Sequence, residues 1–411
     1  MISNFFPPAH FGGYELECAG IVGHLSKEHS VLVLTSRHER RQAPHDAQVL
    51  RVLPHGSFRK RDSLRAPLWA LSAARTMRRL LSGFDPDLIF VWNATQIPQA
   101  TLRLAELSGR PVAYRVCEHW FGRRYHDDTF MRHLYPGERG LRGVWARAMR
   151  AVNRLSPLRL DVTTPTPGAV SWVSDALREM TPVPPTSVPV FERTIYYGID
   201  QPEEIRRNPT PQPTIAYVGR LTHAKGTDIA IRALSVLERR HGVRAQLVLI
   251  GLHDPPYVRR LRSLARRLEV SDRIVLRGPL PRDVLWHELE AVHAVVIPSR
   301  WQEPAALVTV ESAAHGIPVV AARSGGMPEL LREGDEALFF DIDDVEGCAQ
   351  ALLEVLENPE AAAERAARAR RRAAEFRHDV YHAATDAFLK EAMRAYGDSP
   401  PATARATASS E

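Results

Sequence analysis

Two glutamates, Glu303 and Glu311, stand eight residues apart in a segment whose apolar spacing predicts a helix over Ala305–His315. Eight residues span slightly more than two helical turns, so we expect both carboxylates on one face, the first at the helix start. Carboxylates accept hydroxyl protons, and the free N–H groups of a helix start bind anions. Hydroxyls beside phosphates are the chemistry of a sugar nucleotide. The same spacing also fits an amphipathic helix with two solvated glutamates.

A second segment with chemical potential contains Gly219, Arg220 and Lys225, and it follows a predicted strand. Glycine permits close backbone approach, arginine offers a fork to phosphate oxygens, and lysine offers a point charge. The alternative is a βα turn with solvent-exposed basic residues. Lys225 weakens that alternative, because only four of the 54 basic residues in the chain are lysines.

A third segment runs from Phe5 to Gly13 at the first predicted βα turn. Gly12 and Gly13 stand where a helix should begin, and paired glycines there let a phosphate approach the backbone. This motif is weak by itself.

The run from Asp341 to Asp344 has the Asp-x-Asp spacing of some metal sites. It follows a predicted strand and precedes a predicted helix, which favours a helix N-cap with acidic first-turn residues over a metal site. We therefore expect no metal and no cofactor other than the nucleotide-sugar co-substrate.

Together the three segments resemble the retaining glycosyltransferases of family 4, which have the GT-B fold. The resemblance extends over nearly the whole chain and rests on the order of its motifs. In sequence they are Pro7-Pro8, Gly12-Gly13, Tyr197-Gly-Ile-Asp200, Gly219-Arg-Leu221, Lys225-Gly226, Glu303 to Glu311, and Gly325-Gly326 with Glu329.

The resemblance implies a role for each matching residue. Glu311 is similar to the acid that binds the nucleotide ribose, and Glu303 to the acid that faces the transferred sugar. Arg220 and Lys225 resemble the pair that neutralises the diphosphate. The remaining donor-binding positions are backbone groups of Gly12, Gly13, Gly219, Leu307 and Val308.

His119 follows a predicted strand and matches the histidine that touches the donor sugar from the first domain of such enzymes. A lone histidine in this place is more often structural. With His119 included, the resemblance implies four catalytic residues, which are Arg220, Lys225, Glu303 and His119.

The implied reaction moves a hexose, similar to glucose or N-acetylglucosamine, from a UDP-sugar to a hydroxyl acceptor with retention. Negative charge develops on the departing diphosphate, where Arg220, Lys225 and helix N-termini stabilise it without a metal. The resemblance implies front-face attack with the leaving phosphate accepting the proton, so we expect no side-chain general base. Ala305-Ala306 stands where the family usually has Phe-Gly, and Tyr197 where asparagine is common.

The elements that must position these residues alternate between strands and helices, which predicts two parallel, doubly wound α/β domains with a cleft between them. We expect an N-terminal acceptor-side domain, a proline-rich hinge, a nucleotide-sugar domain, a helix that crosses back, and a disordered tail. Their ranges are 1–200, 201–213, 214–375, 376–396 and 397–411.

Several strands are expected from short apolar runs rich in branched residues, and helices lie between them. Proline density marks linker over Thr181–Val190 and again over Gln201–Pro213. Strands are expected at Val31–Thr35, Val49–Leu53, Asp87–Val91, Val112–Val116, Asp161–Thr164, Thr214–Val218, Gln246–Ile250, Arg273–Leu276, His293–Ile297, Pro318–Ala321 and Ala337–Phe340. Helices are expected at Gly13–Glu28, Leu64–Leu81, Gln96–Leu107, Val144–Leu155, Ala169–Met180, Thr227–Arg240 and Ala361–Arg394. The last of these helices is expected to break near Phe376.

Composition excludes several classes of protein. With 44% hydrophobic and 25% charged residues, the chain of 411 residues is neither disordered nor collagenous. No apolar run reaches the roughly 18 residues of a membrane helix. Three separated cysteines give no disulfide or zinc pattern, and Met1 to Pro8 do not resemble a signal peptide, so we expect a cytoplasmic protein.

The formal charge of +6 belongs to the N-terminal half, because residues 121–160 alone contain nine arginines and three acidic residues. This stretch indicates either an anionic acceptor or peripheral contact with an anionic membrane. A solvated basic helix without a ligand fits equally well. No nucleic-acid-binding module is present, so the expected partners are a nucleotide sugar and a small-molecule, glycan or lipid acceptor.

A catalytically inactive scaffold that binds sugar nucleotides is the alternative function. The intact set of acidic and basic residues argues against it. A Rossmann dehydrogenase is set aside because no Gly-x-Gly-x-x-Gly turn follows a predicted strand. The acceptors we expect belong to bacterial natural-product, cell-envelope or small-molecule glycoside biosynthesis.

Overall fold

The computed structural model describes residues 1–9, 12–38, 48–55, 65–134, 140–155, 160–184, 186–252 and 254–398. It divides the chain into two units. Unit 1 contains Met1–Val173, Leu177–Ile195 and His382–Glu411, and unit 2 contains Ser174–Ala176 and Tyr196–Tyr381. Most of the expected tail, from residue 399 on, lies outside the described residues.

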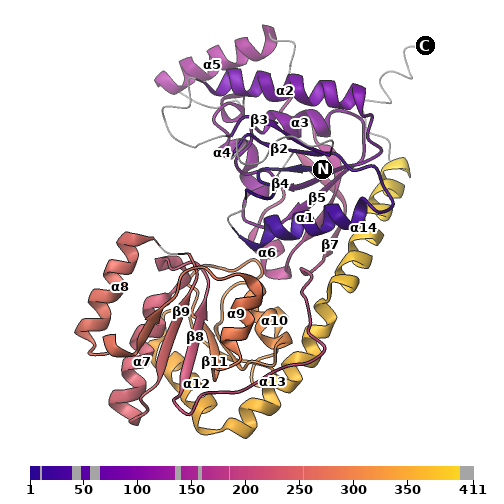
Figure 1. Cartoon of the computed structure of the whole chain (residues 1–411). Coiled ribbons are helices and arrows are strands. Elements are labelled where there is room, and N and C mark those ends of the chain that lie inside the picture. Colours follow the sequence, from indigo (N-terminus) through magenta and orange to yellow (C-terminus); the bar gives the residue numbers. More distant parts are fainter. Residues whose placement is uncertain are drawn as a thin grey trace. The chain divides into compact units, whose positions relative to one another are not determined.

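Unit 1 is built on a parallel sheet with strand order β3-β2-β1-β4-β5-β6-β7. Every residue of β4 and β5 is buried, as expected for central strands covered by helices on both faces (Figure 1). The elements are β1 (Ile2–Ser3), α1 (Gly13–Leu25), β2 (Val33–Ser36), β3 (Val49–Leu53), α2 (Ala66–Gly83), β4 (Ile89–Asn93), α3 (Ala100–Glu106), β5 (Val112–Val116), η2 (Phe121–Arg123), α4 (Arg124–Asp127), η3 (Met131–Leu134), α5 (Gly140–Leu155), β6 (Thr166–Trp172), α6 (Asp175–Met180, which begins in unit 2) and β7 (Ser187–Thr194).

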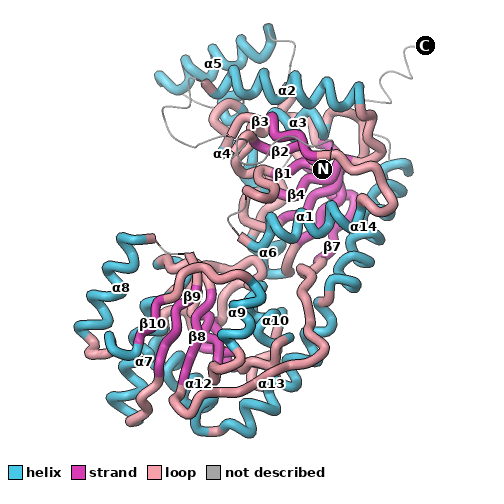
Figure 2. The backbone as a smooth tube through the Cα atoms, in the orientation of Figure 1, coloured by secondary structure: helices cyan, strands magenta, loops and turns pink. Residues whose placement is uncertain are grey.

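Unit 2 repeats the plan with strand order β10-β9-β8-β11-β12-β13. Its elements are β8 (Thr214–Val218), η4 (His223–Lys225), α7 (Thr227–His241), β9 (Gln246–Ile250), α8 (Pro255–Arg267), η5 (Ser271–Arg273), β10 (Ile274–Leu276), α9 (Arg282–Leu289), β11 (Ala294–Ile297), α10 (Leu307–Ala314), β12 (Val319–Ala322), α11 (Met327–Leu330), β13 (Leu338–Phe340), α12 (Val345–Glu357), α13 (Pro359–Ala373), η6 (Ala374–Phe376) and the first turn of α14 (His378–Asp398), which continues in unit 1 (Figure 2).

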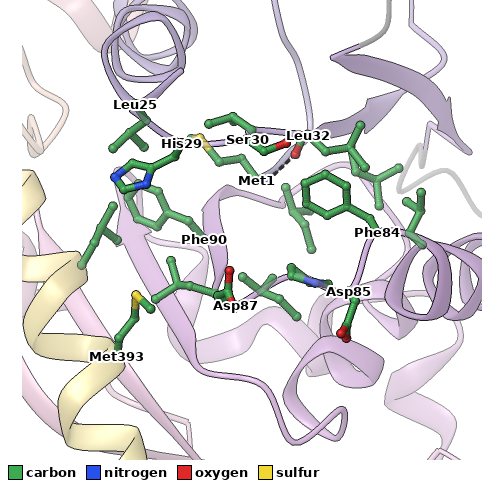
Figure 3. A pocket seen from close by; sticks show the side chains of 18 of the residues that line it. Met1, Leu25, His29, Ser30, Leu32, Phe84, Asp85, Asp87, Phe90 and Met393 are labelled. Atoms are coloured by element: carbon green, nitrogen blue, oxygen red, sulfur yellow. Dashed lines mark hydrogen bonds between the residues drawn. The ribbon is translucent and has the colours of Figure 1, made fainter. Parts of the chain in front are cut away.

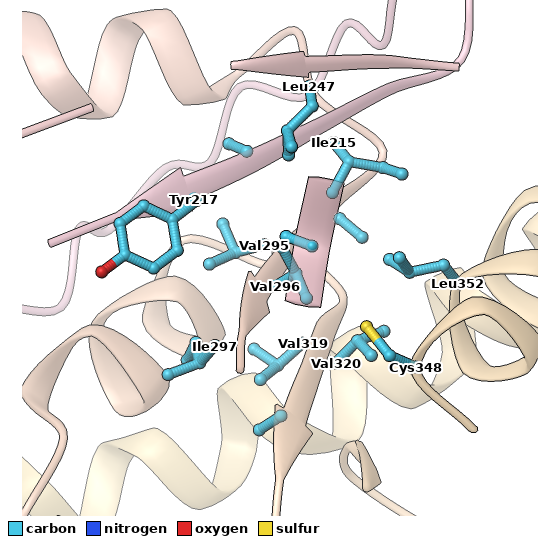
Figure 4. Packing of buried hydrophobic residues seen from close by; sticks show 14 of the residues in the cluster. Ile215, Tyr217, Leu247, Val295, Val296, Ile297, Val319, Val320, Cys348 and Leu352 are labelled. Carbon is cyan, nitrogen blue, oxygen red and sulfur yellow. The ribbon is translucent and has the colours of Figure 1, made fainter. Parts of the chain in front are cut away.

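The core of unit 2 is an apolar layer that fixes its central strands. Ile215 on β8, Val295 on β11 and Val320 on β12 are at most 1% exposed, and Leu352 of α12 belongs to the same cluster (Figure 4). In both sheets the chain order reverses beside the first strand, between β1 and β4 in unit 1 and between β8 and β11 in unit 2. Open α/β sheets bind ligands at the carboxyl ends of strands at such a reversal.

Three expectations for the secondary structure of unit 1 were wrong, and all concern the end of its sheet. The expected strand Asp161–Thr164 is a loop, and the expected helix Ala169–Met180 is β6 followed by the short α6. The expected linker Thr181–Val190 contains the start of β7, an edge strand that pairs with β6. An edge strand tolerates proline, and Pro189 lies opposite Gly168. A short apolar run such as 169–173 does not distinguish helix from strand.

Candidate functional site

Lys225 and Glu303 form the centre of the site in unit 2. The Lys225 Nζ lies 2.6 Å from Oε1 and 2.8 Å from Oε2 of Glu303. Lys225 follows β8 and Glu303 follows β11, so the pair lies where the strand order reverses. The Glu303 side chain is 8% exposed and that of Lys225 24%, so the carboxylate is buried and the lysine side chain stays partly exposed.

The Glu303 carboxylate is held by its own loop as well as by Lys225. Ser299, which is buried, donates its hydroxyl to Oε1 of Glu303. The backbone N–H of Gly326 donates to the Glu303 carbonyl at 2.8 Å. Gly325 has φ +55°, and a Cβ there would lie 2.2 Å from that carbonyl oxygen. The glycine pair thus allows the β12–α11 loop to pack directly on the backbone of Glu303.

Two contacts fix the loop that presents Lys225. Gly226 has φ +68°, and a Cβ at this position would lie 1.7 Å from the carbonyl oxygen of Pro298. Arg300 binds Asp228 through two hydrogen bonds of 2.7 and 2.9 Å, which ties the start of α7 to the β11 loop. The two loops that carry Lys225 and Glu303 are therefore held against each other.

The Gly219-Arg220 turn lies just before this loop. Gly219 has φ +150°, and the buried Tyr217 donates its hydroxyl to the carbonyl of Arg220 at 2.8 Å. The Arg220 side chain is exposed, and within the described part of the chain it forms no ion pair. Its guanidinium is consequently available to a ligand at the carboxyl end of β8.

The structure changes the relation between the two glutamates. Helix α10 begins at Leu307, so Glu303 lies in the preceding loop and the expectation that both carboxylates share one helix face was wrong. Gly325 and Gly326 pack against the backbone of Glu303 and Pro304. Helical periodicity in the sequence does not predict this contact. The first N–H groups of α10, at Leu307 and Val308, have no acceptor within the helix. Both residues are partly exposed.

Glu311 lies inside α10 and faces Arg282, the first residue of α9. The Arg282 Nη2 is 2.7 Å from Oε1 of Glu311 and 3.6 Å from Oδ2 of Asp200. Burial raises the pKa of Glu311, Arg282 opposes that effect, and Asp200 reinforces it. Sequence reasoning missed Arg282 because nothing local connects α9 with α10. Asp200, in contrast, belongs to a recognised motif, and Ser299 stands four residues before Glu303.

Removing Arg282, the counter-ion of Glu311, should make the free energy of unfolding depend more strongly on pH. In Arg282→Gln the pKa of the buried Glu311 carboxyl should rise further above its unfolded value. The folded protein then holds a proton that the unfolded chain has lost, so the free energy of unfolding should fall as pH rises above the ordinary carboxyl pKa of about 4.3. Unfolding midpoints measured from pH 4 to 8 should show a steeper decline than in the parent protein.

The control is Arg282→Gln/Glu311→Gln, which should lose this extra decline. His315 also faces Arg282, and burial, Arg282 and Arg370 lower the pKa of His315 to about 4. Because the double variant also lacks Arg282, it includes any change that the loss of Arg282 causes in the titration of His315. Parallel pH curves for the parent and the single variant would contradict the role of Arg282 as counter-ion.

The remaining candidate residues lie in unit 1 at the carboxyl edge of its sheet. Gly12 is the N-cap of α1, and its N–H donates to Oε2 of Glu15 at 2.9 Å. Glu15 is fully buried and was not recognised from the sequence. His119 follows β5 and its Nδ1 lies 3.2 Å from the Thr181 hydroxyl.

Glu329, from the glycine-pair motif, accepts three hydrogen bonds. They come from the N–H groups of Asp175 (2.8 Å) and Ala176 (2.5 Å) and from the Tyr196 hydroxyl (3.0 Å). All four residues belong to unit 2. This carboxylate therefore anchors the unit 2 segments at 174–176 and 196.

The aspartates of the possible metal motif are engaged elsewhere. Asp344 caps α12 by accepting from the Gly347 N–H at 2.9 Å, as expected for an N-cap. Asp341 pairs with Arg323 and Asp343 with Arg300. Within the described residues, no three His, Cys, Asp or Glu side chains gather in a way that could hold a metal ion.

A separate cavity of about 380 Å³ lies in unit 1 at the amino-terminal ends of β1, β2 and β4. Met1, Leu32, Phe84 and Phe90 point into it, with Met393 of α14 at its side (Figure 3). Its lining contains none of the candidate site residues. It lies at the sheet edge opposite the one that carries Gly12 and His119.

Most of unit 2 is similar in sequence to known proteins. Residues 200–373 match the family model described as "Glycosyl transferases group 1". The D-inositol 3-phosphate glycosyltransferase of Acidothermus cellulolyticus is 37% identical over 149 residues, covering 35% of this chain and 33% of that protein. A GDP-mannose-dependent alpha-(1-6)-phosphatidylinositol monomannoside mannosyltransferase of Mycolicibacterium smegmatis is 34% identical over 162 residues, covering 37% and 41%. The matches thus span well under two thirds of these relatives.

Solved structures match almost the whole chain. The HepE protein of Anabaena, in complex with UDP and glucose, has a TM-score of 0.64 at 19% identity, covering 95% of this chain and 98% of that one. Sucrose-phosphate synthase from Thermosynechococcus elongatus has a TM-score of 0.67 at 18% identity, covering 96% and 98%. This likeness confirms the predicted fold class, which is two Rossmann-like parallel α/β units of the GT-B type.

Proposed function

From a GT-B fold whose second unit matches the group 1 glycosyltransferases, we propose that the chain is a retaining hexosyltransferase. It moves a glucose-like or N-acetylglucosamine-like hexose from a UDP-sugar to a hydroxyl acceptor in bacterial glycoside or envelope biosynthesis. The observation that carries the proposal is the Lys225–Glu303 pair at the strand-order reversal of unit 2. A catalytically inactive scaffold would not need to retain the buried Glu303 carboxylate against the partly exposed Lys225 ammonium.

Lys225 can serve both its partner and a phosphate. An ammonium has three N–H donors, and two of them point at the Glu303 oxygens. The third is free to meet a diphosphate oxygen, together with the exposed Arg220 guanidinium and the first N–H groups of α10. These groups stabilise charge where it appears on the leaving diphosphate. The proposed mechanism uses this protein charge in place of a metal ion.

The two glutamates have separate tasks in this proposal. Glu303, with its carboxylate oriented by Ser299 and Lys225, accepts hydroxyl protons of the transferred sugar. Glu311 accepts the ribose hydroxyls, and Arg282, 2.7 Å away, opposes the rise in the pKa of Glu311 that burial causes. His119 contacts the donor sugar from unit 1, and the phosphate backbone contacts include Gly12, Gly13 and Gly219.

The choice of UDP is supported by the HepE complex with UDP, whereas one relative is described as GDP-mannose-dependent. The described relatives glycosylate inositol phosphates and phosphatidylinositol mannosides, so a phosphorylated polyol or its lipid fits the acceptor class that we propose. We propose a cytoplasmic location, where nucleotide sugars are made.

The test is a thermal-shift panel of UDP, GDP, ADP and dTDP without added metal. A nucleotide at about 100 times its dissociation constant should raise the free energy of unfolding by about 2.7 kcal/mol. We expect UDP to stabilise the protein, and 2′-deoxy-UDP to do so much less because Glu311 loses one hydroxyl. Glu311→Ala should abolish the UDP shift, and Glu269→Ala, an exposed glutamate of unit 2, should leave it unchanged.

A selective shift with GDP would replace the UDP assignment and leave the transferase proposal standing. Stabilisation by UDP without transfer to any acceptor tested would instead favour the scaffold. The absence of a shift with all four nucleotides would overturn the proposed donor site.

A further inference from the structure

The basic stretch 121–160 separates into buried and exposed arginines in unit 1. Arg124 is 3% exposed and donates to Oε1 of Glu106 at 2.8 Å, and its guanidinium lies over the Phe121 ring. Glu106 also accepts from Arg103 and from the hydroxyls of Tyr114 and Tyr125. Arg124 is therefore part of the folded core and takes no part in binding an anionic partner.

Helix α5, which contains several of the other arginines, is fastened to unit 1 by one face. Ala146 is fully buried and Met149 is 5% exposed. Arg150 donates to the carbonyl of His133 at 3.2 Å. The Asn153 side chain donates to the carbonyl of Leu160 at 2.9 Å and accepts from its N–H at 3.0 Å. These contacts fix which side of the helix faces outward.

The outward face of α5 is apolar. Val144 is 54% exposed, Val152 43% and Leu155 88%, and Ala148 and Ala151 between them are also exposed. Their spacing of four, seven, eight and eleven residues from Val144 places them on one stripe of the helix. In an ordinary amphipathic surface helix the outward face is polar. The outward face of α5 instead carries this apolar stripe.

Arginines border this stripe. Arg147 and Arg154 are exposed, and neither pairs with a carboxylate among the described residues. The helix sequence from Gly140 to Leu155 contains no acidic residue. The result is an apolar face with positive charge beside it, which is the composition of helices that lie in the interface of an anionic bilayer.

Helix α8 in unit 2 shows that charge alone does not single out α5. It has five exposed arginines, which are Arg259, Arg260, Arg262, Arg266 and Arg267. Its large apolar residues Val258, Leu261 and Leu264 are all buried, at 4% to 6% exposure. Arginines with no exposed apolar side chain between them form a solvated face, as ordinary surface helices do.

We infer that α5 docks unit 1 on an anionic phospholipid surface, with Val144, Val152 and Leu155 entering the headgroup region and Arg147 and Arg154 meeting the lipid phosphates. No helix in the described part of the chain is long and apolar enough to cross a bilayer. The contact is therefore a docking of one helix face. It rests on the surface of unit 1 and is independent of the proposed transfer reaction.

The test is flotation of the full chain with vesicles of phosphatidylcholine, with and without 30 mol% phosphatidylglycerol (a composition chosen for the assay), in the absence of nucleotide sugar. We expect flotation only with the anionic vesicles, and its loss at high salt. Val152→Ser/Leu155→Ser should weaken binding by at least about 10-fold. Arg147→Gln/Arg154→Gln should weaken it by about 25-fold, from roughly fivefold per arginine near an anionic surface.

Two matched controls should float like the parent protein. Val380→Ser/Met393→Ser removes two apolar side chains that are each 45% exposed on α14. Arg259→Gln/Arg266→Gln removes two exposed arginines of α8. The substituted side chains are exposed, so the α5 variants should unfold at the same temperature as the parent protein. That result excludes misfolding as the cause of weaker binding. Equal binding to neutral vesicles, no flotation at all, or α5 variants that bind as tightly as the parent would each overturn the inference.

Discussion

Lys225→Met should lower kcat/KM of the transfer reaction by about 10³-fold, the magnitude typical of losing a preorganised group that stabilises transition-state charge. Methionine keeps the length of the side chain and removes its charge. Among the described residues, it also leaves the buried Glu303 carboxylate with Ser299 as its remaining side-chain partner. We therefore expect a loss of roughly 1–3 kcal/mol in the free energy of unfolding in addition to the kinetic effect.

A double variant separates the two effects. In Lys225→Met/Glu303→Gln the buried group is neutral, so most of the lost stability should return while the transfer rate stays low. Lys390→Met, at one of the other three lysines, should keep the activity of the parent protein. The measurements are initial rates with the nucleotide sugar that the thermal-shift panel selects and urea unfolding of each variant. Near-parent rates in the single variant would remove Lys225 from the proposed mechanism.

Gly226→Ala should cost on the order of 3 kcal/mol of stability and most of the activity. The position combines φ +68° with a Cβ site 1.7 Å from the carbonyl oxygen of Pro298, and 2.7 Å from its carbonyl carbon. Both atoms are backbone, so no side-chain rotation relieves the contact. The loop must shift, and Lys225, one residue earlier, must move with it away from Glu303.

Gly242→Ala provides the matched control for this prediction. Gly242 has φ +69°, nearly the same conformation, and no atom lies within 4 Å of its Cβ site. It should cost about 1 kcal/mol, which is the conformational cost alone, and should leave the transfer rate unchanged. Equal urea midpoints for the two variants would show that the Pro298 contact has no effect on stability.

The repeated pattern of the strands was determined by the sequence alone. The expected strands Val49–Leu53, Val112–Val116, Thr214–Val218 and Gln246–Ile250 have those bounds in the structure. Each is a short, mainly apolar run that contains branched residues and is bounded by loop residues, which is the sequence pattern of a strand in an α/β sheet. The likeness of the second unit to group 1 glycosyltransferases was also recognisable in the sequence, because its motifs are short and local.

The sequence also predicted that Lys225 and Glu303 act in the same reaction, and the structure brings their side chains into contact. The prediction came from motif order, since nothing in local periodicity says that two residues 78 positions apart touch. Their contact depends on β8 and β11 being neighbours in the sheet, which is a property of topology. Once those strands pair in parallel, the loops after them emerge at the same edge.

Other features were decided only by tertiary structure. Whether 187–194 is linker or strand depends on β6 being available to pair with it, and the proline density of 181–190 predicted a linker there. The Arg282–Glu311 pair joins the start of α9 to the middle of α10. The apolar outward stripe of α5 depends on η3 and Leu160, which hold the opposite face. Sequence periodicity reports which residues could share a face, whereas burial, ion pairing and exposure are set by neighbours that are distant in the chain.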